Sequence, residues 1–241
     1  MQDYPQQQGI DQILRNAFFY WKKTWMYQFM VGALYFSVLM LVYIYFASKF
    51  GILDQFISIS QQNGNDFKKM QTALIELTKN PNYATLSLII IGTKVFLYPL
   101  EVGLLKIYRK IDLKEEYSVP DLLSGYSGAN FFIYAGYYMF WYTIFTYSIP
   151  TLILPLVWIL ITLFVTPLMF FKNIRVFEGI SLSIKALKSN FILILVGFLV
   201  ALIFKTAGFL FFFFGYLVTY PFMTAMVYSM YQALFKEEEL G

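Results

Sequence analysis

The sequence contains no cysteine and no histidine, and only 13% of its 241 residues are charged. Without cysteine there is no disulfide, no thiolate nucleophile and no thiolate metal ligand. Without histidine the commonest general base and the commonest metal ligand are also missing. A soluble globular domain carries roughly 25% charged residues, so this chain has too little polar surface to cover a water-soluble particle. We therefore expect a membrane protein with no metal and no cofactor.

Apolar residues make up 59% of the chain, which contains 27 Phe and 20 Tyr and has a mean hydropathy of +0.60. A bilayer core about 30 Å thick is crossed by roughly 20 apolar helical residues. The apolar runs predict an all-α fold, a polytopic transmembrane bundle of about six helices that forms a single integral membrane domain over residues 1–241. The expected spans are residues 26–48, 85–105, 130–149, 151–171, 190–207 and 209–233.

Basic residues near the ends of the spans predict the orientation, because cytoplasmic loops carry an excess of Lys and Arg. Twelve of them share one side with the N-terminus and five lie on the other side. We therefore expect a multi-pass protein with both termini in the cytoplasm.

Residues 49–84 then form a sizeable loop on the outer side. Apolar residues at Phe50 and Leu53 continue the helical period of the first span and predict a helix that projects outward. Asp66 is placed to cap a second amphipathic helix in this loop. The loop is expected either to cover the bundle or to dock a partner.

A weak internal repeat runs through the chain. Each even-numbered span carries a proline before its cytoplasmic end, and amphipathic segments precede the odd-numbered spans at residues 13–19, 122–132 and 180–191. The repeat predicts three units, each a cytoplasmic interfacial amphipathic helix followed by a helical hairpin; chance similarity among apolar segments is the alternative. In the third unit Arg175, Lys185 and Lys188 lie opposite the apolar residues and are candidates for contact with lipid headgroups.

Two charged residues, Lys94 and Glu101, lie inside the second expected span. They are seven residues apart, so they share a helix face about 10 Å apart along the axis, which is too far for a good ion pair. Charges at bilayer depth are functional candidates, since leaving them unpaired is costly. The alternative is structural: Lys94 can extend toward the interface, and Pro99 frees a backbone carbonyl and favours a kink.

The run KIYRKIDLKEEYSVPD, residues 106–121, mixes acidic and basic residues. Clustered carboxylates can perform acid–base chemistry, but alternating signs are typical of a solvated helix face. Ser118 and Asp121 have the spacing of a capping box. Tyrosines and Trp141 crowd the third span, where they favour either an aromatic helix interface or a pocket for a lipid or isoprenoid. We assign no catalytic residue.

The segments PLEVGLLKIYRKIDLKEEYSVPDLLSGYSGANFF and TPLMFFKNIRVFEGISLSIKALKSNF carry a resemblance over nearly the whole chain. The sequence resembles an uncharacterised bacterial family of six-span integral membrane proteins. It is more loosely similar to the membrane domain of glycerophosphodiester phosphodiesterases. The resemblance implies the bacterial inner membrane. Members of the family are often labelled beta-carotene monooxygenases, but such oxygenases hold iron with histidines, which this chain lacks.

These observations predict a non-enzymatic inner-membrane protein that binds lipid or a partner membrane complex in a scaffold or assembly role. One alternative is a small transporter or export permease that uses Lys94 and Glu101. A second is a membrane-embedded enzyme that modifies lipids with converging Asp and Glu side chains. The basic residues show no pattern of a nucleic-acid surface, so we expect membrane lipids, and a membrane complex, as partners.

Overall fold

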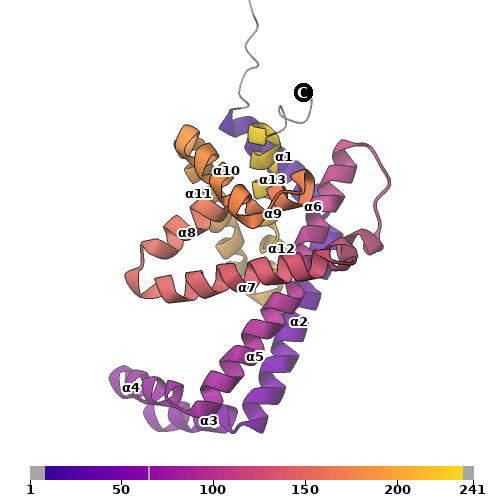
Figure 1. Cartoon of the computed structure of the whole chain (residues 1–241). Coiled ribbons are helices and arrows are strands. Elements are labelled where there is room, and N and C mark those ends of the chain that lie inside the picture. The colour runs from indigo at the N-terminus through magenta and orange to yellow at the C-terminus, as the bar shows by residue number, and fades with distance from the viewer. Residues whose placement is uncertain (1–8, 65, 236–241) are drawn as a thin grey trace, which may run out of the picture. The chain divides into compact units, whose positions relative to one another are not determined.

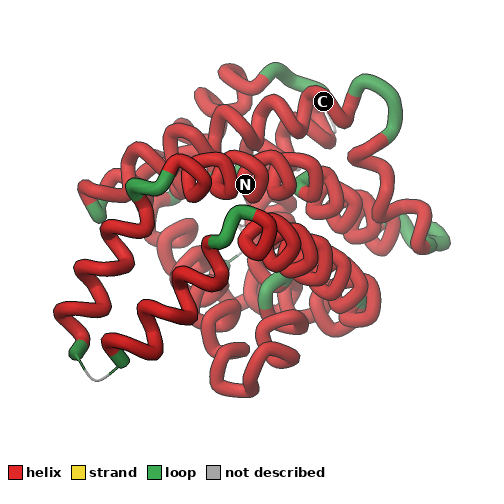
Figure 2. Tube along the Cα trace, turned by 90° about the horizontal axis from the view of Figure 1, so that it is seen from below, coloured by secondary structure: helices red, strands yellow, loops and turns green. Residues whose placement is uncertain are grey.

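The computed structural model describes residues 9–64 and 66–235, except the side chains of residues 211–214. Within these ranges the chain is helical and contains no strand (Figures 1 and 2). Four helical segments are long and apolar enough to cross a membrane: Trp25–Lys49, Pro81–Asp112, Leu154–Lys172 and Phe191–Leu210. The all-α prediction is confirmed, and the four segments agree with a membrane protein. The count of six spans and the internal repeat stay predictions.

Internal contacts divide the chain into two compact units, Leu34–Leu97 and a larger one made of Met1–Ala33 and Tyr98–Gly241. The smaller unit holds most of α2 (Trp25–Lys49) and all of α3 (Ile52–Asn63), α4 (Phe67–Thr78) and α5 (Pro81–Leu97). The larger unit holds α1 (Ile10–Lys23), α6 (Pro99–Asp112), α7 (Asn130–Ser148), α8 (Leu154–Thr162), α9 (Val165–Lys172), α10 (Val176–Ser189), α11 (Phe191–Ala207), α12 (Phe212–Thr219) and α13 (Phe222–Phe235). Three short 3-10 helices join these elements: η1 (Val119–Tyr126), η2 (Ile149–Thr151) and η3 (Gly208–Phe211).

The smaller unit consists of helices joined by short segments. Gly51 has φ +67° and ends α2, so the prediction of a helix that continues outward from the first span is wrong. Glycine adopts this left-handed conformation without steric cost. The prediction that Asp66 caps a helix is confirmed, because its side chain accepts a hydrogen bond from the Lys69 backbone N–H at 3.1 Å. Residues 52–63 and 67–78 are helical, as expected for this loop.

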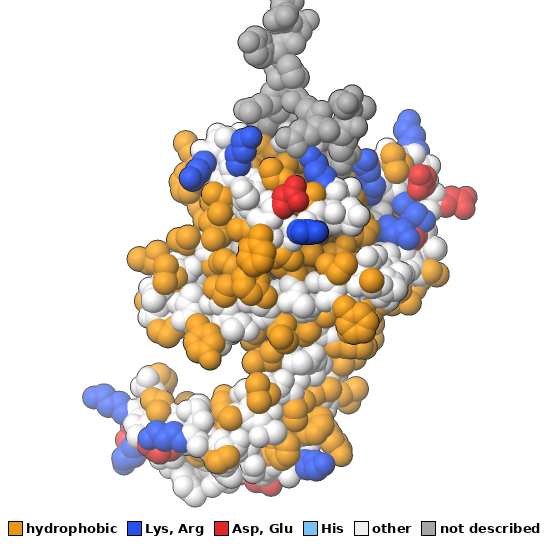
Figure 3. Space-filling model, viewed as in Figure 1, with side chains coloured by type: hydrophobic (Ala, Val, Ile, Leu, Met, Phe, Trp, Pro, Cys, Tyr) orange, Lys and Arg blue, Asp and Glu red, His pale blue; other side chains and the backbone are white. Residues whose placement is uncertain are grey.

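The larger unit is built around α13, which packs against α1, α6 and α11 (Figure 1). Ser229 on α13 donates a hydrogen bond to the Ile13 carbonyl on α1 at 2.7 Å. Asp112 accepts one from Tyr20 at 2.6 Å and another from Tyr228 at 2.5 Å. The amphipathic helix α1 therefore buries one face against protein. In Figure 3 the charged side chains of this unit gather over α1, α10 and the chain after α6, and much of the remaining visible face is apolar.

Three of the expected spans are broken rather than continuous helices. The helix breaks lie at Tyr98, at residues 163–164, and at residues 220–221. A proline at or just after each break, at positions 99, 167 and 221, lacks an N–H and clashes with the carbonyl four residues earlier. The kink at Pro99 stays a prediction, and prolines also lie at or just after the interruptions of the expected spans 151–171 and 209–233.

The short helix η1 lies against α6 where two glycines permit close approach. A Cβ atom on Gly103 would overlap the backbone of Leu122, and one on Gly125 would overlap the backbone of Pro99. The amphipathic segment expected at 122–132 is thus a 3-10 helix and a turn that lead into α7, because these contacts hold the chain close to α6.

Asp121 fixes η1 to α6. It forms the predicted capping box with Ser118 and accepts hydrogen bonds from Lys106 at 3.0 Å and Lys110 at 2.9 Å. Its side chain is 7% exposed, so the solvated-face interpretation is wrong for Asp121, although Glu115 and Glu116 are exposed.

These contacts predict an acid-sensitive component of stability. Burial alone would raise the pKa of Asp121, but Lys110, the Ser118 N–H and Lys106 outweigh it and lower the pKa from 3.8 to about 2. A lowered carboxyl pKa contributes stability above the unfolded value, and this contribution is lost as the pH falls toward the folded value. Thermal unfolding between pH 5 and 2 should therefore show a steeper loss of stability between about pH 4 and 2 for the natural chain than for Asp121→Asn. Parallel curves would contradict the assignment.

Candidate functional site

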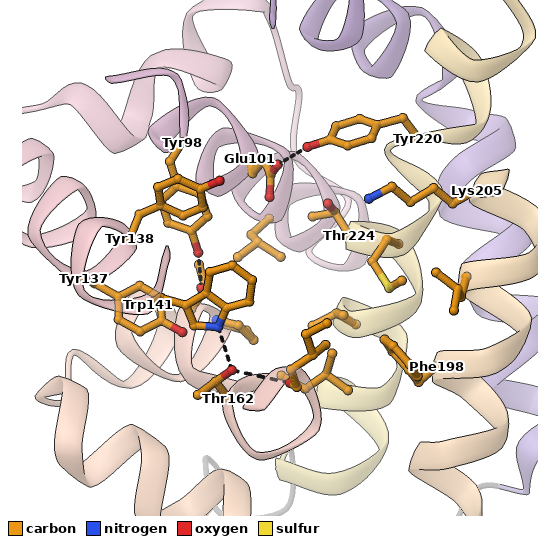
Figure 4. Close-up of a pocket in the computed structure, with 18 residues that line it drawn as sticks. Tyr98, Glu101, Tyr137, Tyr138, Trp141, Thr162, Phe198, Lys205, Tyr220 and Thr224 are labelled. Carbon is orange, nitrogen blue, oxygen red and sulfur yellow. Dashed lines mark hydrogen bonds between the residues drawn. The ribbon is translucent and has the colours of Figure 1, made fainter. Parts of the chain in front are cut away.

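A cavity of about 320 Å³ lies inside the larger unit, and its wall is mostly apolar and aromatic (Figure 4). That volume is at the low end of small-molecule sites. Helices α6, α7, α8, α9, α11 and α13 supply the wall, together with Tyr220 between α12 and α13. Three of the four candidate spans contribute residues, so the cavity belongs to the apolar body of the unit.

The three broken helices bring equivalent residues to this cavity. The residues that precede the three prolines, namely Tyr98, Thr166 and Tyr220, all line it. The sequence reads YPLE at residues 98–101, TPLM at 166–169 and YPFM at 220–223. Tyr98 and Thr166 are hydrogen-bonded to each other through their hydroxyl groups. The cavity is therefore formed where three similar helix interruptions meet.

One end of the cavity is charged. Glu101, on the first turn of α6, accepts a hydrogen bond from the Tyr220 hydroxyl at 2.6 Å. The Nζ atom of Lys205, on the last turn of α11, lies 4.5 Å from the centre of the Tyr220 ring, a distance typical of a cation–π contact. Lys205 and Glu101 also attract each other electrostatically. Figure 4 shows the ammonium group of Lys205 directed into the cavity toward the side where Glu101 lies.

The opposite wall is a stack of aromatic rings. The Tyr98 and Tyr138 rings are stacked with their centres 4.4 Å apart, and Tyr138 stacks on Trp141 at 6.0 Å. The Trp141 indole N–H donates to the Thr162 hydroxyl at 2.8 Å. The aromatic residues of α7 thus form a helix interface and a pocket wall at once, so the two interpretations of this sequence do not exclude each other.

The structure separates the two intramembrane candidates that the sequence suggested. Glu101 lies at the charged end of the cavity, whereas Lys94 lies on α5 in the smaller unit, is half-buried and is not among the residues that line the cavity. The cation beside Glu101 is Lys205. In the sequence Lys205 is followed by Thr206-Ala207-Gly208, a pattern typical of a helix stop.

The three interfacial candidates lie on or next to α10. Arg175 is the N-cap residue of this helix, and Arg175, Lys185 and Lys188 are all exposed. The buried residues of α10 are Gly179, Ser183 and Ala186, and its Val176 and Ile180 pack against the hydrophobic core, while Phe177 is 76% exposed. Lipid contact by the three basic residues stays a prediction.

The acidic residues proposed for an enzyme do not converge. Asp112 is bonded to tyrosines and Asp121 to lysines, and Glu115 and Glu178 are exposed. Residues 9–64 and 66–235 contain no group of three or more Asp and Glu side chains that could hold a metal ion.

Sequence reasoning missed Lys205 and Tyr220 as site residues. The similar tetrapeptides YPLE, TPLM and YPFM could have identified Tyr220, because Glu101 ends the first of them and Tyr220 begins the third. Lys205 carries no such signal, because its partner on α6 is 104 positions away in the chain.

Comparison of the chain with models of protein families, with curated proteins and with solved structures finds no match. The resemblance to a bacterial six-span family therefore stays a prediction.

Proposed function

We propose that this chain is a non-enzymatic integral membrane protein that binds a lipid or a lipid-like amphiphile in the cavity of its larger unit. The observation that carries the proposal is a cavity with apolar and aromatic walls and a single charged end, formed by Glu101, Lys205 and Tyr220. Ligand pockets combine such apolar walls with a few polar groups that fix orientation. The sequence also lacks Cys and His, which supports binding rather than chemistry.

Filling the cavity tests this proposal. Thr224 projects into the cavity (Figure 4), whereas Thr143 is exposed on α7. We expect native mass spectrometry of protein released from lipid nanodiscs to show a bound amphiphile of defined mass on the natural chain and on Thr143→Trp. Thr224→Trp should retain at least about tenfold less, because the indole occupies the ligand volume. An unliganded natural chain, or equal retention by both variants, would overturn the proposal.

A small transporter is the second candidate function, favoured by the charges within the cavity. The pair that it would use is Glu101 with Lys205, since Lys94 does not line the cavity. In proteoliposomes, uptake of the amphiphile identified by mass spectrometry should then be abolished by Lys205→Met and unaffected by Lys94→Met. Binding without any transbilayer uptake would exclude this alternative.

We further propose six spans in a bacterial inner membrane, with both termini in the cytoplasm. The excess of basic residues on the side of the termini supports this orientation. Counting α7 and the α12–α13 segment as spans adds two to the four candidates. This scheme also places the three proline-interrupted helices at even-numbered positions, as a threefold repeat of hairpins requires.

Single cysteines in this cysteine-free chain test the topology, because they react with a membrane-impermeant maleimide only from the side they face. The residues chosen, Gln62, Glu115, Thr151 and Lys188, are exposed. With six spans, external reagent should label Cys at 62 and 151 and leave 115 and 188 unlabelled. With only four spans, the pattern reverses at two positions: 151 becomes protected and 188 becomes labelled.

A further inference from the structure

The charged end of the cavity has hydrogen-bonding capacity that the protein does not use. Within the described residues, Lys205 Nζ contacts the face of the Tyr220 ring and is attracted to Glu101 without a direct ion pair. Its ammonium carries three N–H donors and donates none of them to a described protein acceptor. One oxygen of Glu101 accepts from Tyr220, and the other has no described protein donor. The space between the two groups therefore suits a ligand atom that can accept a hydrogen bond from Lys205 and donate one to Glu101.

Several polar groups along the aromatic wall of the cavity have partners within the protein. Tyr98 is bonded to Thr166, and Trp141 donates to Thr162. Thr162 in turn donates to the Trp158 carbonyl at 2.6 Å. The polar groups that can still form hydrogen bonds to a ligand therefore lie at the Glu101–Lys205 end, and the rest of the wall is apolar or aromatic. This arrangement matches a molecule with one small polar head and an apolar body.

The charges at this end decide the class of the head group. Glu101 and Lys205 have opposite formal charges, so the end is neutral before a ligand enters. A carboxylate, phosphate or ammonium head would leave a net charge in an apolar site, which is strongly unfavourable. A hydroxyl adds no charge, accepts a hydrogen bond from an ammonium and donates one to a carboxylate.

We infer that the cavity binds an uncharged amphiphile with a hydroxyl head group, placed between Lys205 Nζ and the free oxygen of Glu101. This inference rests on the proposed ligand binding and adds the chemistry of the head. Alkyl alcohols, monoacyl and diacyl glycerols and isoprenoid alcohols share this chemistry.

A matched series of photoreactive probes tests the inference on the full chain in nanodiscs. Each probe carries the same ten-carbon chain with a diazirine, and its head is a hydroxyl, a methyl ether, a carboxylate or an ammonium. Labelled residues are mapped by mass spectrometry. The hydroxyl probe should label cavity residues at least about tenfold more than the methyl ether, since hydrogen bonds to charged groups are among the stronger ones. A second hydroxyl probe with an isoprenoid body separates isoprenoid from straight-chain sources.

Lys205→Met should remove the preference for the hydroxyl head, and Lys22→Met, which changes an exposed lysine on α1, should leave it unchanged. Equal labelling of the cavity by all four heads, or stronger labelling by a charged head, would overturn the head-group inference and leave the binding proposal standing. No labelling of cavity residues by any probe would overturn both. The comparison of heads on the natural chain needs no variant and stays decisive if Lys205→Met does not fold.

Discussion

Removing one charge of the Glu101–Lys205 pair should lower the free energy of unfolding by roughly 3 kcal/mol. Removing both charges should lower it by much less than the sum of the two single losses. Glu101→Gln leaves the Lys205 ammonium in an apolar cavity without its counter-charge, and Lys205→Met leaves the carboxylate in the same position. Isolated charges are unfavourable there, whereas a neutral pair of side chains is not. Reversible unfolding of each variant in mixed micelles measures this effect.

The control for this cycle is Lys185→Met, since Lys185 is exposed on α10 and its substitution should change the free energy of unfolding by less than about 0.5 kcal/mol. Additive effects of Glu101→Gln and Lys205→Met would mean that the two groups do not interact. That result would remove the electrostatic basis for the charged end of the cavity.

Replacing Gly103 by alanine should destabilise the larger unit by about 1–3 kcal/mol or more, the usual range for overpacking. The new Cβ would overlap backbone atoms of Leu122, which cannot move aside as a flexible side chain could. The displacement of η1 would also pull Asp121 away from Lys106 and Lys110. Thermal unfolding in detergent, compared at one pH, measures the loss.

Gly136→Ala on α7 is the matched control, because nothing lies within 4 Å of the position its Cβ would take. Alanine is favoured over glycine within a helix by about 0.5–1 kcal/mol, so this variant should be as stable as the natural chain or slightly more stable. Equal loss from both substitutions would contradict the close approach of α6 and η1.

The sequence predicted best the helices that are uninterrupted apolar runs. The expected spans 26–48, 130–149 and 190–207 agree closely with α2, α7 and α11, because such runs form helices whatever their neighbours are. The expected spans 85–105 and 151–171 overlap the candidate segments Pro81–Asp112 and Leu154–Lys172, each made of two helices, and the expected span 209–233 is divided between η3, α12 and α13. Their prolines were visible in the sequence, but the position of each helix break depends on contacts with other helices.

The candidate site was predicted only in part. Glu101 was identified because a carboxyl group in an apolar run is unusual. Its partner was sought seven residues away at Lys94, since both would share one face of a straight helix. The structure places Lys94 on α5 and Glu101 on α6, in different units. The actual neighbours, Lys205 and Tyr220, come from distant segments, and the pattern along a single helix cannot show which distant helices pack together.

An experimental structure of the full chain in lipid nanodiscs tests the central claim most directly. We expect elongated non-protein density in the cavity, with its polar end within hydrogen-bonding distance of Lys205 Nζ and Glu101 and its apolar part along the rings of Tyr138 and Trp141. A cavity closed by the surrounding side chains, or filled only by water between Lys205 and Glu101, would contradict it.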